Sequence, residues 1–178
     1  MLVTQSGFQY ETTTWMSKRP VFLRLASLIG YVLSRRQGLL ATLTRPYIHH
    51  LMHIALSRYL HAYDYLIRHQ GQFDKVMLSD VRDVVFQSDP FITASEDVHT
   101  GEESILIKEN VYNCWWVDRL EDDWDEVERI RNMPAICSGV TIGGASHILN
   151  YLVRMVEMII TSLPIHGFQY GFDQGLHN

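Results

Sequence analysis

Hydrophobic residues along this chain follow two patterns, a helical spacing and short continuous runs. Between Ile48 and Ile67 they recur about every three to four positions, the spacing of one buried face of a helix. Pro46 stands near the predicted start of this helix, and Gly71 stands where a glycine commonly ends one. The apolar run Lys75–Ser79 follows at once and predicts a buried strand.

The same helical spacing predicts two more helices. Residues 21–36 form an apolar stretch that Gly38 ends, and Ile148–Ile160 has apolar residues on one side and polar residues on the other. Ser146 is predicted to cap the second of these helices. Residues 112–131 combine paired tryptophans with an acidic run, and we expect a helix or a loop excursion there.

Short apolar runs predict two further strands, Ser104–Ile107 and Ala135–Ile142, the second interrupted by Gly139. The tail, residues 166–178, is polar and rich in glycine. Helices that alternate with short apolar strands are typical of α/β proteins. We therefore expect one domain over residues 1–178, with a mixed, mostly parallel sheet flanked by helices.

The composition is that of a globular protein, because 47% of the residues are hydrophobic and 20% are charged. The net charge of −5 argues against nucleic acid or an anionic membrane as a partner. Arg24 interrupts the apolar stretch at 21–33, which is too short to span a bilayer, so no transmembrane segment is predicted. The N-terminus lacks the pattern of a signal peptide and two cysteines make no disulfide framework, so we expect a cytoplasmic protein.

Two aspartates, Asp80 and Asp83, follow the predicted strand at Lys75–Ser79, with Arg82 between them. Carboxylates at the end of a buried strand face the crevice in which open α/β sheets hold ligands. Two carboxylates in one site repel each other unless a cation neutralises them. That cation is either Mg²⁺ or Mn²⁺, which prefer oxygen ligands and usually accompany a phosphate-bearing substrate, or the guanidinium of Arg82.

Three segments occur in this order along the chain: SDVRDVVFQSDPF at 79–91, ICSGVTIGG at 136–144 and GFDQGLHN at 171–178. Together they resemble the aspartate motif, the N-S-G-V segment and the D-Q-x-x-x-N element of nucleotide-diphospho-sugar transferases with the GT-A fold. The resemblance implies a GT-A-like domain that moves a sugar from a nucleotide-diphosphate sugar to an acceptor that the sequence does not identify.

The resemblance also implies roles for individual residues. Asp80 and Asp83 would hold Mn²⁺ or Mg²⁺, and Arg82 would orient these acids or contact phosphate. Asp173 and Gln174 would be the catalytic pair that positions the donor sugar or the acceptor. Asp173 would then be placed to act as a general base.

The chain also departs from the family pattern in ways that leave two alternatives open. Val81 stands where the first aspartate of the motif is usual, Cys137 replaces the usual asparagine, and Asn178 is the last residue. The alternatives are a catalytically inactive GT-A-like binding module and a fragment truncated at both ends. A phosphatase of the aspartyl-phosphate type is disfavoured, because Arg82 stands in its nucleophile motif.

Other residues suggest chemistry less specifically. His49 and His53 have a spacing that can bind zinc on a helix, but no glutamate of a zincin stands between them, so a solvated helix face is expected. Trp115 and Trp116 either stack on a sugar or base or anchor the core. Arg58 either packs on the long helix or reaches a phosphate.

Overall fold

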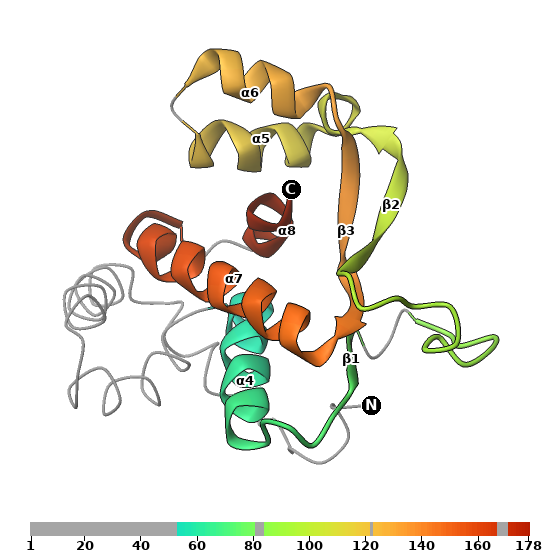
Figure 1. Ribbon diagram of the computed structural model, residues 1–178. Helices are drawn as coiled ribbons and strands as arrows, with labels where there is room; N and C mark the ends of the chain where they lie inside the picture. The colour runs from blue at the N-terminus through green and yellow to red at the C-terminus, as the bar shows by residue number, and fades with distance from the viewer. Residues whose placement is uncertain (1–52, 81–83, 122, 167–170) are drawn as a thin grey trace.

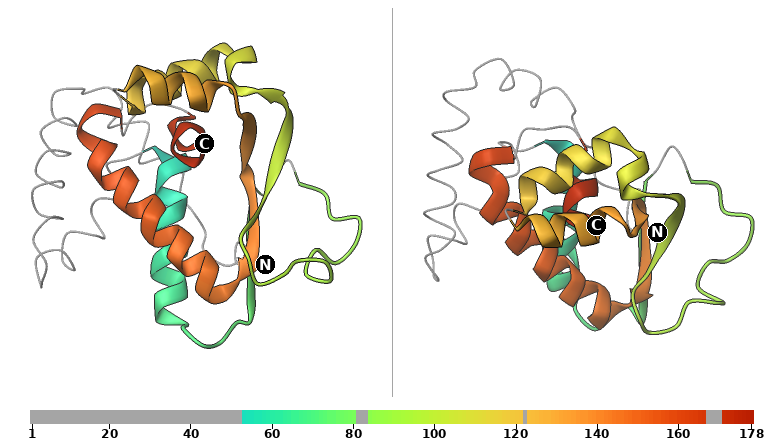
Figure 2. Two further views of the ribbon diagram at one scale, coloured as in Figure 1. Left: turned by 45° about the horizontal axis from the view of Figure 1, so that its top comes forward. Right: turned by 90° about the horizontal axis from the view of Figure 1, so that it is seen from above.

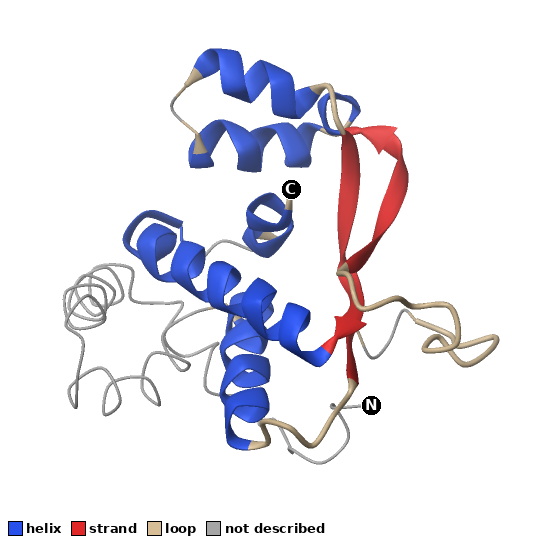
Figure 3. Cartoon of the chain, in the orientation of Figure 1, coloured by secondary structure: helices blue, strands red, loops and turns tan. Residues whose placement is uncertain are grey.

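A computed structural model describes residues 53–80, 84–121, 123–166 and 171–178, which form a three-stranded sheet and the helices around it (Figures 1 and 3). The helix predicted at 21–36 and the first part of the long helix lie outside these ranges. None of the helices described is both long and apolar enough to cross a membrane. In chain order the elements are α4 (Ile54–Arg68), β1 (Lys75–Ser79), β2 (His99–Leu106), the 3-10 helix η2 (Ile107–Glu109), α5 (Val111–Leu120), α6 (Trp124–Arg131), β3 (Pro134–Gly144), α7 (Ala145–His166) and α8 (Phe172–His177).

The sheet has the order β1-β3-β2, and both outer strands run antiparallel to β3. The prediction of a mostly parallel sheet is therefore wrong for the described residues, although a mixed helix and strand architecture is confirmed. Parallel neighbours need a crossover that carries the chain back to the start of the first strand. Here η2, α5 and α6 instead turn the chain round at one end of the sheet (Figure 1), so β3 returns beside β2 in the opposite direction.

Most predicted elements are present, with shifted ends. β1 has the predicted bounds, while β2 begins earlier than expected and β3 continues through Gly139 without a break. α4 ends at Arg68, and Gly71 has a φ of 79° in the turn that follows. Ser146 is not the N-cap of α7, because that helix already begins one residue before it.

The excursion at 112–131 consists of two helices, each capped by a side chain. Asn110 accepts hydrogen bonds from the first backbone amides of α5, and Asp123 accepts one from the start of α6. The two helices are joined by Arg131 and Asp118, whose atoms Nη2 and Oδ2 lie 2.6 Å apart. The acidic run thus contributes the cap of α6, and Val127 on the same helix packs in a small core.

The main core lies between the sheet and three helices, α4, α7 and α8, which gather on one side of it (Figure 2). Apolar residues at helical spacing supply its contacts, as the sequence pattern predicts. Its fully buried members include Leu56, Ile148, Leu152, Ile159 and Phe172. Because α4 precedes β1 and α8 is the last element, this core brings segments far apart in the sequence next to one another.

The tail forms a short helix, α8, that the glycine-rich sequence did not predict. Gly171 precedes it with a φ of 74°, a conformation that glycine adopts without strain. Gly175 lies against Trp116 of α5, so closely that an added Cβ would stand 2.5 Å from the tryptophan Cβ. Trp116 is therefore a packing anchor, one of the two roles considered for it, and α8 is held by tertiary contact rather than by helix propensity.

Candidate functional site

The guanidinium of Arg58 is the centre of a polar cluster that joins α4, β1, β3 and α8. Its Nη1 atom donates to Oδ1 of Asp80. Its Nη2 atom lies 2.8 Å from the carbonyl oxygen of Ser138, 2.8 Å from Oδ2 of Asp173 and 3.0 Å from the hydroxyl of Tyr59. One side chain thus connects the three segments on which the family resemblance rests.

Helix α4 presents Arg58 toward the sheet because its neighbours in the helix are buried. Leu56 and Leu60 are in the main core, and Tyr59 is 3% exposed. The helix begins at His53, whose Nδ1 accepts a hydrogen bond from the backbone of Ala55. A cation at the edge of such an apolar face needs paired anions, and Arg58 has two.

Asp80 is placed by the end of β1. Its backbone amide donates to the carbonyl of Gly139 at 2.8 Å, which extends the pairing of β1 with β3 by one bond. Gly139 also makes room for the carboxylate, since an added Cβ would lie 3.1 Å from Oδ2 of Asp80 and 3.3 Å from Sγ of Cys137. The Asp80 side chain is 44% exposed, so it is open to solvent as well as to Arg58.

The amides of Gln174 and Asn178 bind β3 just beyond the point where β1 ends. Gln174 accepts from the Ser138 amide at 2.9 Å and donates to the Ile136 carbonyl at 2.6 Å. Asn178 accepts from the Ile136 amide at 2.7 Å and donates to the same carbonyl at 3.1 Å. The spacing of four residues puts both amides on one side of α8, where they satisfy β3 backbone groups that a longer β1 would otherwise pair.

Asp173 lies in the same helix but points to Arg58. Its side chain is 7% exposed, and Oδ2 also accepts from the hydroxyl of Ser138 at 3.4 Å. A carboxylate this deeply buried is stable only when paired, and Arg58 supplies the pairing charge. Since Gln174 holds the backbone of Ser138, α8 positions both the acid and the strand that face Arg58.

The cluster carries one positive and two negative charges. Burial by itself lowers the pKa of Arg58, but Tyr59 and the two carboxylates more than offset this, so the pKa lies above its ordinary value and the group stays charged. Nε of Arg58 is buried without a hydrogen-bond partner among the described residues. Nη2 of the guanidinium therefore has a full set of acceptors, while Nε has an N–H group with no acceptor among the described residues.

A second polar pair, Tyr151 and His177, lies beside this cluster. The Tyr151 hydroxyl and Nδ1 of His177 are 2.7 Å apart, and Nε2 of His177 is buried with no partner in the described part of the chain. Burial lowers the pKa of His177, and the charge of Arg58 lowers it further, while Asp173 acts in the opposite direction. The neutral imidazole is the favoured form here.

A small cavity of about 70 Å³ opens at the cluster. Its lining is polar along β3 and α4, from Arg58, Ser138 and Thr141, and apolar at Leu78 and Ala62. Pockets that hold a whole drug-sized ligand are usually about 300 Å³ or larger. The cavity therefore fits a single group or a few water molecules, and not a complete nucleotide sugar.

The structure brings together Asp80, Asp173 and Gln174, three of the five predicted site residues. The other two, Arg82 and Asp83, lie outside the described residues. His49, one half of the zinc spacing, lies outside them as well, and the other half, His53, is the N-cap of α4.

As a metal ligand Asp80 fits one particular kind of site. Within the described ranges no group of three or more histidine, cysteine or acidic residues is arranged to hold an ion. Mg²⁺ and Mn²⁺ sites that also use substrate phosphates need only one or two carboxylates. Asp80, with an exposed carboxylate at the end of a strand, suits that arrangement rather than a cage built from protein ligands alone.

Two features of the site were underestimated from the sequence. Arg58 was expected to pack on the helix or to reach a phosphate, and its pairing with Asp80 and Asp173 was not anticipated. The available signal was its position within the apolar stripe of α4, where a lone cation indicates a buried partner. The backbone of Ser138 and Ile136 was also missed, because a backbone acceptor has no signature in the sequence.

Comparison with known protein families, curated proteins and solved structures gave no match for this chain.

Proposed function

We propose that this chain is a nucleotide-sugar-dependent glycosyltransferase domain that acts with Mn²⁺ or Mg²⁺ on an acceptor of unidentified class. The observation that carries this proposal is the meeting of Asp80, Ser138 and Asp173 on Arg58. Each of the three comes from a different segment of the family resemblance. A chance likeness in three separate segments gives no reason for them to meet at one side chain.

In this proposal Asp80, together with Asp83, ligates the divalent ion. When bound, the ion would supply Lewis-acid stabilisation of the negative charge that develops on the leaving nucleoside diphosphate. Arg58 lies beside Asp80, and its Nη1 atom bonds one acceptor among the described residues, which leaves an N–H group that suits an oxygen-rich ligand in the cavity. Arg82 remains a candidate for orienting the acids or contacting phosphate.

The predicted roles of Asp173 and Gln174 take a more indirect form. Because the Asp173 side chain is only 7% exposed and pairs with Arg58, we propose that it acts by holding the guanidinium. Gln174 holds the Ser138 backbone, whose carbonyl accepts from the same guanidinium. Both residues are then positioning residues, and direct contact with a sugar falls to other groups.

One observation favours the alternative of a binding module without catalysis. Arg58 already neutralises part of the charge on both carboxylates, so the cluster is stable without any metal ion. Such a module would fold without gaining stability from metal and nucleotide together. The same measurement therefore separates the two functions.

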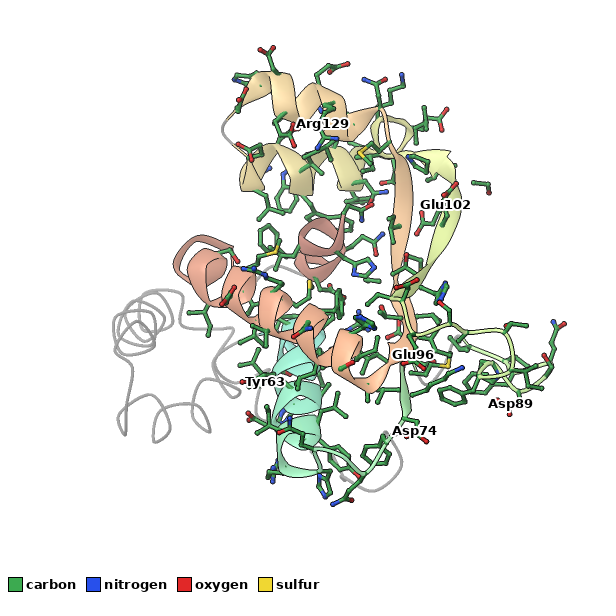
Figure 4. The ribbon with its side chains drawn as sticks, in the orientation of Figure 1. Tyr63, Asp74, Asp89, Glu96, Glu102 and Arg129 are labelled. Carbon is green, nitrogen blue, oxygen red and sulfur yellow. The ribbon has the colours of Figure 1, made fainter. Side chains whose placement is uncertain are left out.

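The test is thermal stabilisation of the full chain by UDP, GDP and their sugars, with and without Mn²⁺. A ligand that binds only the native state raises its stability by mass action. We expect a shift that needs both nucleotide and metal and that Asp80→Asn and Asp83→Asn each abolish. The matched control is Asp74→Asn, at the opposite end of β1 (Figure 4), which should keep the shift.

Two results would count against the transferase. One is no stabilisation by any nucleotide with Mn²⁺ present, which favours the inactive module. The other is a shift that survives both Asp80→Asn and Asp83→Asn, which would put the ligand elsewhere on the protein.

A further inference from the structure

The two nitrogen atoms at the tip of Arg58 have different partners. Nη1 donates only to Asp80 among the described residues, whereas Nη2 serves Tyr59, Ser138 and Asp173. Three acceptors on Nη2 fix the guanidinium in place. The contact with Asp80 is therefore the one that can be given up without moving the side chain.

Asp80 is also the carboxylate that the proposed function assigns to a divalent ion. Arg58 bonds one oxygen of this carboxylate, Oδ1, and a divalent cation on the same carboxylate would lie close enough for the two positive charges to repel each other. Asp80 is 44% exposed, so an ion from solvent can reach it, while Asp173 at 7% is closed off. Competition at this site is thus confined to Asp80.

We propose that Arg58 competes with the divalent ion for Asp80 and so keeps the metal site weak until an oxygen-rich ligand takes over Nη1. This inference rests on the proposed function, since it takes Asp80 as a metal ligand. Ion binding releases Nη1 from Asp80, which leaves Arg58 with a free donor beside a cavity that this residue helps to line and that has room for a single group. The binding of the metal ion and the binding of the nucleotide sugar are then coupled, because both depend on which acceptor Nη1 of Arg58 bonds.

The test compares Mn²⁺ binding to the wild type and to the double variant Arg58→Gln/Asp173→Asn. This variant removes one positive and one negative charge, so the net charge of the cluster is unchanged and Asp80 loses its partner. It also removes both members of the buried pair, which avoids a stranded carboxylate. Free Mn²⁺ is followed by its electron paramagnetic resonance signal without any nucleotide, and a far-ultraviolet circular dichroism melt checks that each variant is folded.

The expected result is a dissociation constant for Mn²⁺ that falls about tenfold or more in the double variant, because a hydrogen bond to a charged group no longer opposes the ion. Asp80→Asn in the same background should abolish the gain. The control Arg68→Gln/Asp74→Asn removes the same residue types at exposed positions and should bind Mn²⁺ like the wild type. Arg58→Lys serves as a second variant, since one ammonium cannot serve Asp80, Asp173 and the Ser138 carbonyl as a fork does, and it should also tighten binding.

Equal dissociation constants in the wild type, the double variant and Arg58→Lys would overturn the competition. If Asp80→Asn still weakened Mn²⁺ binding in the wild-type background in that case, the proposed metal site would stand and only the competition with Arg58 would fall. If Asp80→Asn changed Mn²⁺ binding in no background, the metal site and the competition would both fall.

Discussion

Nη2 of Arg58 on α4 lies 2.8 Å from Oδ2 of Asp173 on α8, although 115 positions separate the two residues in the sequence. The pair connects the first described helix to the last. It makes the stability of the fold and the geometry of the candidate site depend on the same contact. Replacing Arg58 is therefore expected to reduce the stability of the fold and to disturb the geometry of the candidate site.

Replacing Arg58 by methionine should therefore destabilise the protein strongly. Removing one partner of a buried ion pair leaves the other charge unpaired, and Asp173 is almost fully buried. Because Arg58 itself is 31% exposed, we expect a loss near the lower end of the usual range, about 3 kcal/mol of unfolding free energy. Urea denaturation followed by tryptophan fluorescence measures it.

Arg68→Met on the exposed part of the same helix is the control and should cost little. Adding Asp173→Asn to Arg58→Met should recover part of the loss, because the stranded charge is then gone. An Arg58→Met variant as stable as the Arg68→Met control would show that the ion pair contributes nothing.

The amide of Gln174 predicts a second, more local effect. In Gln174→Glu one oxygen can still accept from the Ser138 amide, but the donor to the Ile136 carbonyl is lost and a carboxylate faces that carbonyl. A loss of about 1 kcal/mol of unfolding free energy is expected, because this half-buried carbonyl keeps its hydrogen bond from Asn178 but loses the one from Gln174. Gln72→Glu in the exposed turn after α4 makes the same chemical change and should leave the urea midpoint unchanged. Equal midpoints for the two variants would argue against the amide contacts between α8 and β3.

The contact between Gly175 and Trp116 predicts a steric effect. A methyl group at position 175 would meet the Trp116 Cβ at 2.5 Å and the Leu120 side chain at 3.2 Å, so Gly175→Ala must push α8 away from α5. Overpacking of this kind costs about 1–3 kcal/mol of unfolding free energy. Gly101→Ala on β2 is matched, because its new Cβ would meet only Cys137 at 3.7 Å. Thermal melts that rank Gly101→Ala as the less stable variant would contradict the packing described.

The parts of the fold that sequence patterns predict are those set by local spacing. β1 was predicted with its observed bounds because the helical spacing of apolar residues stops before Lys75 and a short continuous apolar run begins there. The predicted direction of the strands, mostly parallel, was wrong, because the direction depends on where η2, α5 and α6 return the chain. Two strands and an intervening helical segment are compatible with either direction until the packing of that segment is known.

The candidate site shows the same division between local and distant causes. Asp80, Asp173 and Gln174 were identified because each stands in a short segment with a recognisable pattern. The role of Arg58 as the centre of the cluster was underestimated, because its partners Asp80, Ser138 and Asp173 lie 22, 80 and 115 positions away in the sequence. α8 was missed because Gly171 and Gly175 suggest a loop, and its helix depends on contacts with Trp116 and β3 that no local pattern encodes.

His177 predicts how stability depends on pH. Burial and the nearby charge of Arg58 lower its pKa in the folded protein below the ordinary value of 6.5, and among the described residues its Nε2 has no hydrogen-bond partner. Well above pH 6.5 the imidazole is neutral in both states and its titration does not change the free energy of unfolding. As the pH falls below that value the unfolded chain takes up a proton that the folded chain resists, so the free energy of unfolding decreases until the lowered folded pKa is reached.

His177→Gln should therefore flatten the fall in stability between about pH 7.5 and about pH 5, measured by urea denaturation at several pH values. Burial lowers the pKa of His53 as well, with Asp173 opposing it, so His53→Asn should also reduce the fall in stability over this pH range. Asparagine is a good N-cap, which keeps the start of α4 intact in that variant. If both variants lost stability with the slope of the wild type, the acid sensitivity would have to come from other groups, and the neutral state assigned to His177 beside Arg58 would be wrong.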